Sequence, residues 1–153
     1  MEAEEIKKTY RERESQIRDR LGDFRELRNA GDPRIFKELV FVILTSRSLA
    51  KKAWEATEKL DELGLLEKGS REEIAEVLES CDIQYERNKA EYIASNRGSL
   101  SQPTLENTSG ELKLRSRIDP SNLEKTREQL VDSLKGIGWK GSSHFLRNTG
   151  HGD

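Results

Sequence analysis

The chain has 153 residues, enough for one medium-sized domain with its own core. Charged residues make up 37% of it and the formal net charge is −2, so a polyanionic partner would need a local basic patch. The single cysteine, Cys81, excludes an internal disulfide, a four-cysteine zinc site and a cysteine-held iron–sulfur cluster, and we expect neither metal nor cofactor.

The sequence shows no sign of a membrane span or an export signal. No apolar run approaches the roughly 20 residues that a membrane-spanning helix needs. The opening residues, MEAEEIKK, have no apolar signal core. We therefore expect a cytoplasmic protein without membrane contact.

Apolar residues recur at helical spacing from the start of the chain, which predicts an all-α fold. The first predicted helix presents Ile6, Tyr10, Ile17, Leu21 and Phe24. Asp32 is expected to cap a second helix with Pro33 in its first turn. The stretch Leu39 to Leu44 is almost wholly apolar, so this helix should be central.

Three shorter helices are predicted next. Ser48 is expected to cap the third helix, which should end near Gly64 and present one apolar face consisting of Leu49, Ala53, Ala56, Leu60 and Leu63. Ser70 and Glu73 have the spacing of a capping box and open a fourth helix. The fifth helix is expected over Tyr85 to Asn96.

The composition changes between Gly98 and Asn122, where Ser, Thr, Asn, Gly and Pro predominate, so we expect a loop or insertion over 98–122. Helical spacing returns with Leu123, and no stretch alternates like a strand. We expect one helical domain over 1–153.

The most informative motif is LKGIGWKGSSHFLRN, residues 134–148, which predicts a helix-hairpin-helix. Gly136 and Gly138 permit a tight turn, and Ile137 can fill the angle between the helices. Bare glycine amides and the N-terminal end of the next helix can hold a phosphate without reading base sequence. Lys135 adds charge, and no acidic residue occurs from Ser133 through Gly152. The same two glycines could also serve close helix packing alone.

The segment REQLVDSLKGIGWKGSSHFLRNTG resembles the corresponding stretch of the archaeal-type 8-oxoguanine DNA glycosylase/AP lyases, within the helix-hairpin-helix glycosylase superfamily. ELVFVILTSRS resembles the central buried helix of that family and the turn after it, and YERNKAEYI resembles another of its helices. The resemblance implies base-excision DNA repair, with 8-oxoguanine-containing double-stranded DNA as partner and a nucleoid location. It implies no obligate protein partner.

The resemblance implies that Lys140, just after the hairpin glycines, is the nucleophile. Its amine would attack C1′ of the damaged nucleotide, expel the oxidised base and leave a Schiff base, from which β-elimination cuts the strand. The amine must be neutral to attack. A helix N-terminus, a nearby Lys135 and partial desolvation would favour that form. Without the resemblance, Lys140 would be taken for an ordinary surface lysine.

The family also uses an aspartate inside a motif similar to Ile-Leu-Asp-Arg-His, at a distance from the lysine that falls beyond Asp153. We therefore expect a helix-hairpin-helix glycosylase fold that is incomplete at the C-terminus, with lost or weak activity. Asp153 itself is expected to be a linker residue.

Other residues have both a functional and a structural interpretation. Arg47 corresponds to a position that in relatives fills the gap left by an extruded base, but it could be a plain surface arginine. Arg87 and Lys89 could contact DNA or form a charged solvated face. His144, one turn after Lys140, could face DNA or be structural. The alternatives to an enzyme are a non-catalytic helix-hairpin-helix DNA-binding module and an all-α interaction protein.

Overall fold

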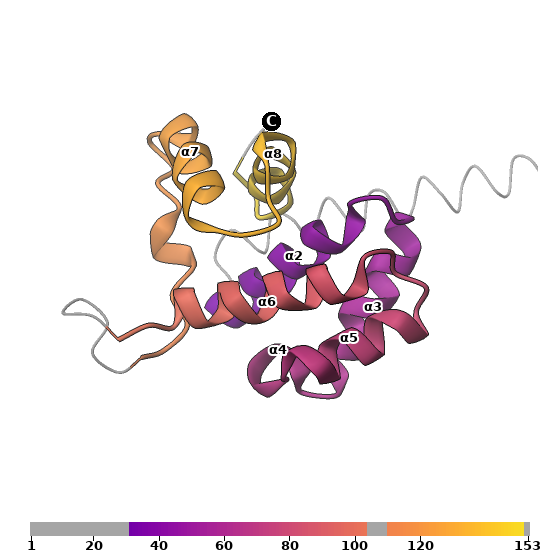
Figure 1. The fold of residues 1–153 in the computed structure, drawn as a ribbon. Coiled ribbons are helices and arrows are strands. Elements are labelled where there is room, and N and C mark those ends of the chain that lie inside the picture. Colours follow the sequence, from indigo (N-terminus) through magenta and orange to yellow (C-terminus); the bar gives the residue numbers. More distant parts are fainter. Residues whose placement is uncertain (1–30, 104–109, 152–153) are drawn as a thin grey trace, which may run out of the picture.

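The chain is described here by a computed structural model, which covers residues 31–103 and 110–151 (Figure 1). These residues form the helices α2 (Asp32–Thr45), α3 (Ala50–Glu62), α4 (Leu65–Lys68), α5 (Arg71–Ser80), α6 (Glu86–Leu100), the 3₁₀ helix η1 (Arg115–Arg117), α7 (Leu123–Ser133) and α8 (Trp139–Asn148). The described ranges contain no strand, which confirms the all-α prediction. None of the helices in these ranges is long and apolar enough to cross a membrane. The predicted helix from Ile6 to Phe24 lies outside the described residues.

Helix α2 is the central element of the fold. Every residue from Ile35 to Leu44 is buried, so the prediction of a central helix is confirmed. A helix that is buried all round must be covered by neighbours on several sides. α2 packs against α3, α6 and α8. Figure 1 shows α7 and α8 together on one side of α2, with α4 and α5 on the other.

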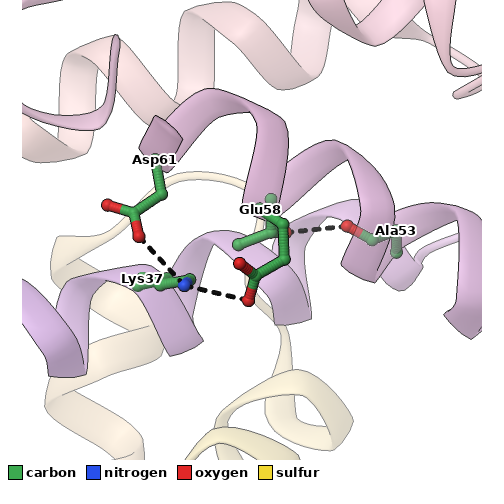
Figure 2. A network of polar contacts seen from close by, with 5 residues as sticks. Lys37, Ala53, Glu58 and Asp61 are labelled. Atoms are coloured by element: carbon green, nitrogen blue, oxygen red, sulfur yellow. Dashed lines mark hydrogen bonds and ion pairs between the residues drawn. The ribbon is translucent and has the colours of Figure 1, made fainter. Parts of the chain in front are cut away.

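The buried stretch of α2 includes a lysine that is paired across to α3. The ammonium of Lys37 lies 3.0 Å from a carboxylate oxygen of Glu58 and 3.0 Å from one of Asp61, as Figure 2 shows. It also lies 5.4 Å from the centre of the Trp54 ring. A buried charge without partners would cost several kcal/mol, so these contacts let α2 keep a lysine in its packed face. They also fix α3 against α2.

The start of α2 differs from the prediction. Pro33 does lie in its first turn, but the N-cap is Gly31 and Asp32 does not cap the helix. The Asp32 carboxylate instead accepts hydrogen bonds from the backbone N–H groups of Leu114 and Arg115, both at 2.7 Å. Asp32 therefore joins the start of α2 to the chain segment that leads into α7.

The start of α3 also differs. Its N-cap is Leu49, and the hydroxyl of Ser48 accepts a hydrogen bond from Lys89 of α6. Ala53, Ala56 and Leu60 are fully buried as predicted. Leu49 and Leu63, the two ends of the predicted apolar face, are 69% and 57% exposed, because the helix ends extend past the core.

The capping box of α5 is confirmed: the backbone N–H of Glu73 donates to Oγ of Ser70, and that of Ser70 donates to the Glu73 carboxylate. Gly64, with φ of 72°, ends the turn after α3 in the left-handed region, as its predicted position at a helix end requires.

The segment expected as a loop over 98–122 begins later than predicted. Helix α6 continues through Gly98 to Leu100, because packing against the core overrides the weak helix propensity of glycine and serine there. Within the described part of the segment, Leu114 and Ile118 are buried. These two side chains anchor a stretch whose composition resembles that of a loop.

Candidate nucleic-acid interface and active site

The hairpin between α7 and α8 is shaped by one glycine. Gly136 has φ of +79°, and a Cβ at this position would lie 2.6 Å from Cδ2 of Tyr92 on α6. Both the backbone conformation and the close approach therefore require glycine. Ile137 is buried between the helices, as the motif predicted. Gly138 is the N-cap of α8 and is exposed, so the N-terminal end of α8 is open to a ligand.

A buried side chain of α6 fixes the position of this hairpin. The amide of Asn96 is 1% exposed, and its Nδ2 donates to the carbonyl oxygen of Lys135 at 2.8 Å. The backbone N–H of Lys135 donates to Oδ1 of Asn96, also at 2.8 Å. One amide thus satisfies both backbone groups of a hairpin residue, much as a neighbouring strand would.

A groove of about 1270 Å³ lies between the turn after α2 and the α7–α8 unit. Five of the seven site residues predicted from the sequence line it: Arg47, Gly136, Gly138, Lys140 and His144. The other lining residues include Ser46 and Ser48 of the turn, Arg127 of α7 and Arg147 of α8. The groove therefore combines exposed glycine backbone, a helix N-terminus and several cationic side chains.

Lys140 is the second residue of α8, beside the hairpin glycines. The first turn of α8 contains no acidic residue, so the positive end of the helix dipole is not neutralised within the helix. The side chain of Lys140 is exposed. The partial desolvation expected from the sequence is thus not provided by the described residues.

His144 lies between the groove and the core, and its expected contact with DNA stays a prediction. It lines the groove one turn after Lys140. Its ring also packs edge-on against Phe41 of α2, with ring centres 6.1 Å apart. One edge of the imidazole therefore contacts the core while the residue borders the groove.

Arg47 lies on the turn after α2 with φ of 56°, an uncommon backbone conformation for an arginine. Its Nη1 donates to the Tyr85 hydroxyl at 3.2 Å, and its guanidinium lies 5.7 Å from the centre of the Tyr85 ring. Tyr85 also has a positive φ, 57°, and is 52% exposed. Strained and exposed residues are frequent at binding sites. Sequence reasoning assigned no role to Tyr85, because nothing local indicates that two turns distant in sequence meet.

Lys135 and Arg87 do not line the groove. Lys135 is exposed on the hairpin. Arg87 borders a separate hollow of about 580 Å³, whose charged lining is mostly acidic: Arg71, Glu72, Glu76, Glu79, Glu86 and Glu91. Lys89, which the sequence placed on a DNA-contacting or solvated face, is only 4% exposed, so both of these interpretations are wrong.

Another pair of a cation with an aromatic ring lies next to Lys140. The guanidinium of Arg127 lies 5.0 Å from the centre of the Trp139 ring, and its Nη2 donates to the Trp139 carbonyl at 3.4 Å. Trp139 is 49% exposed. This contact places Trp139 against α7. Arg127 was missed because its helix position looks like an ordinary solvated face.

Helix α8 is held to the central helix by a buried polar pair. Nδ2 of Asn148 donates to Oε1 of Glu38 at 2.9 Å, and both residues are fully buried. The pair fixes the C-terminal end of the helix whose N-terminal end carries Lys140. It links the last turn of the predicted site helix directly to the core.

Among the described residues, Glu124 of α7 is the carboxylate that lines the groove. Asp153 lies outside the described residues, so its predicted linker role stays a prediction. The same described residues contain no group of three or more His, Cys, Asp and Glu side chains that could hold a metal ion.

Residues 17–153 match the model of a family described as 8-oxoguanine DNA glycosylase, Ogg-HhH. An 8-oxoguanine DNA glycosylase/AP lyase of Fusobacterium nucleatum is 34% identical over 152 residues, and one of Methanocaldococcus jannaschii is 33% identical over 153 residues. Each alignment includes 97% of this chain, and they include 66% and 67% of the two relatives.

Two solved structures have the same fold. The 8-oxoguanine DNA glycosylase of Thermotoga maritima matches with a TM-score of 0.72 and 32% identity, over 96% of this chain and 64% of that one. The Methanocaldococcus jannaschii 8-oxoguanine glycosylase/lyase in complex with DNA containing 8-oxoguanine matches with a TM-score of 0.71 and 30% identity, over 90% and 60%. This chain thus spans about two thirds of the length of its relatives. By its sequence and its fold, the chain belongs to the helix-hairpin-helix 8-oxoguanine DNA glycosylase family.

Proposed function

We propose that this chain belongs to a base-excision repair enzyme that removes 8-oxoguanine from double-stranded DNA and cuts the strand through a lysine Schiff base. The observation that carries the proposal is the groove, in which the open N-terminus of α8, the hairpin glycines, Lys140 and Arg47 meet. The relatives of the chain are named 8-oxoguanine DNA glycosylase/AP lyase, and one structural neighbour is in complex with DNA containing 8-oxoguanine.

In this proposal the hairpin binds the DNA backbone. The exposed Gly138 and the first turn of α8 offer N–H groups to a phosphate, and the helix dipole favours the negative charge. Lys135, which is exposed on the hairpin, adds a cation near the same DNA strand. These contacts do not depend on base sequence, so they set the register of the protein on the duplex.

Lys140 is the proposed nucleophile. Its neutral amine attacks C1′ of the damaged nucleotide, the glycosidic bond breaks, and the base leaves with the bonding electrons and takes up a proton. Loss of the amine proton and opening of the sugar give a Schiff base. β-Elimination then removes a proton from C2′ and breaks the C3′–O bond, which releases the 3′ strand with a 5′-phosphate, and hydrolysis of the remaining Schiff base frees Lys140. DNA bound in the groove would supply the desolvation that the free surface lacks.

The remaining predicted contacts fall around this centre. Arg47 lines the groove from the turn after α2, where it can fill the gap left by an extruded base, and its side chain contacts Tyr85 just before α6. His144 borders the groove on the helix of Lys140. The contact of Arg87 with DNA stays a prediction, and its acidic surroundings weaken it. Because bacterial and archaeal DNA lies in the cytoplasm, the proposal includes a cytoplasmic, nucleoid-associated location.

Borohydride trapping tests the proposal. The chain is incubated with an 8-oxoguanine duplex and borohydride, which reduces a Schiff base to a stable covalent adduct. We expect a weak adduct for the wild type, none for Lys140→Ala, and the wild-type yield for Lys68→Ala, which removes an exposed lysine from α4. If the wild type gives no adduct and behaves like Lys140→Ala, the chain is not an enzyme by itself.

A non-catalytic DNA-binding module is the second candidate. The exposure of Lys140 favours it, because the described residues leave this side chain in solvent, as expected of an ordinary surface lysine. Such a module would bind duplex DNA with the same hairpin and give no adduct in the trapping experiment.

A further inference from the structure

Lys89 is a buried lysine that the proposed chemistry does not use. It lies on α6 and is 4% exposed. Its ammonium donates to the carbonyl oxygen of Leu44 at 3.4 Å, to the carbonyl oxygen of Ser46, and to the hydroxyl of Ser48 at 3.3 Å. The three oxygens come from the last turn of α2 and the turn that follows it.

The end of α2 needs such a partner. Its last turn contains no basic residue, and its C-cap, Ser46, has an extended backbone. The Thr45 hydroxyl donates to the Val42 carbonyl and the Ser48 N–H to the Thr45 carbonyl, while the Leu44 carbonyl accepts a hydrogen bond from Lys89. A cation is favoured at a helix C-terminus by the dipole. Lys89 supplies that cation from α6, across more than forty residues of sequence. Burial lowers the pKa of the Lys89 ammonium, a cost that the three oxygen contacts offset.

The turn that Lys89 binds carries Arg47. Lys89 contacts Ser46 and Ser48, the residues on either side of it. Arg47 has a φ of 56°, a conformation that is kept only where the surroundings hold it. Its guanidinium then contacts Tyr85, four positions before Lys89 on the same segment. One stretch of chain around the start of α6 thus holds both the backbone and the side chain of Arg47.

We propose that Lys89 is a positioning residue: it binds the turn after α2 and thereby presents Arg47 to DNA in the groove. The proposal rests on the proposed function, since the purpose of the positioning is a contact with damaged DNA. It assigns Lys89 no contact with the substrate. Lys89 acts through Arg47.

The first measurement needs no DNA. Trypsin cleaves after arginine only where the backbone can unfold locally, so cleavage after Arg47, followed by mass spectrometry of the fragments, reports how firmly the turn is held. We expect Lys89→Met to speed this cleavage by about tenfold or more, the factor that corresponds to about 1.4 kcal/mol. Lys68→Met, the same change at an exposed site on α4, should leave it unchanged. Ser48→Ala, which removes one of the three acceptors, should give a smaller increase.

The second measurement is the preference for damage. It is the ratio of affinities for a duplex with a tetrahydrofuran abasic analogue and for an intact duplex. We expect Arg47→Ala and Lys89→Met to lower this ratio to a similar extent, about tenfold, and the double variant to lower it no further. Lys89→Arg, which keeps the cation, should recover part of the preference.

The outcomes separate the two proposals. Unchanged cleavage after Arg47 in Lys89→Met overturns the positioning role, whatever the DNA result. Additive losses in the double variant also overturn it, because Lys89 would then act independently of Arg47. A wild-type chain that shows no salt-dependent duplex binding contradicts the proposed function itself, and the positioning role in DNA binding is then rejected with it.

Discussion

Asn96 shows how a single side chain can place a distant backbone. It lies on α6, yet both hydrogen bonds of its amide go to the backbone of Lys135 in the hairpin. An amide can donate and accept at once, which matches the N–H and C=O of one residue. Lys89 works in a related way on the turn after α2, with an ammonium that only donates. Side chains of α6 therefore hold both edges of the groove in place, the hairpin through Asn96 and the turn after α2 through Lys89.

Replacing Asn96 with alanine should lower the stability of the fold much more than the same substitution at an exposed position. Two buried hydrogen bonds are lost and the backbone of Lys135 is left without its partner, so we expect the free energy of unfolding to fall by about 2 kcal/mol in urea denaturation. Asn88→Ala, the same change at an exposed position of α6, is the control and should alter it by less than about 0.5 kcal/mol. Equal effects of the two changes would show that the Asn96 contacts contribute little.

The helices α6, α7 and α8 depend on each other through the hairpin. Gly136 packs its backbone against Tyr92 of α6 so closely that a Cβ has no room. Ile137 fills the angle behind the turn, and a Cβ on Gly141 of α8 would contact it at 3.5 Å. Gly136 thus serves helix packing, whereas a Cβ on Gly138 would have nothing within 4 Å, so Gly138 leaves the turn exposed without a packing role. The two interpretations of the motif, close packing and phosphate binding, are compatible.

Two glycine-to-alanine substitutions with opposite expected effects on stability test the packing role of Gly136. Gly136→Ala meets both a positive φ and the Tyr92 ring, so it should destabilise the fold by about 1–3 kcal/mol and weaken duplex binding. Gly98→Ala, inside α6 with nothing within 4 Å of the added atom, should stabilise by about 0.5–1 kcal/mol. Thermal unfolding measures both. A Gly136→Ala protein as stable as the wild type would disprove the packing argument.

Among the described residues, cationic and acidic side chains gather in two different hollows. The net charge is −2, yet the groove gathers Arg47, Arg127, Lys140 and Arg147. The second hollow, over α5 and α6, has mostly acidic residues around Arg87. A polyanion would therefore approach the groove and avoid the acidic hollow, in spite of the overall charge.

Duplex binding should accordingly weaken as salt is raised. For three or four phosphate contacts the logarithm of the association constant should fall with the logarithm of salt concentration with a slope of about −3. Fluorescence anisotropy between 50 and about 200 mM salt measures it. Arg147→Met should reduce the magnitude of this slope by about one, and Lys68→Met should leave the slope unchanged. A flat salt dependence would favour the all-α interaction protein over both DNA-binding candidates.

Local patterns in the sequence were sufficient for several features. The all-α class follows from apolar spacing, the capping box from Ser70 and Glu73, and the burial of α2 from its apolar stretch. The turn at Gly136 could likewise be read from its glycines. These features are determined within a few residues, where backbone sterics and hydrogen bonding act. The assignments that failed were side chains with a choice of partner: Asp32 and Ser48 looked like caps and instead bind distant groups.

The sequence thus predicted the longer of the described helices, the hairpin and the position of Lys140 beside it, because local sterics and helical periodicity fix them. It did not predict the short helices α4 and η1. Tertiary packing brings Arg47 and Lys140 to one groove, places Arg87 at another hollow, and buries Lys89 beneath a turn, none of which local sequence indicates. The structure also revealed Asn96 as the residue that holds the hairpin. Such pairings join groups that are far apart in sequence, and a polar side chain selects its partner only when packing has removed it from water.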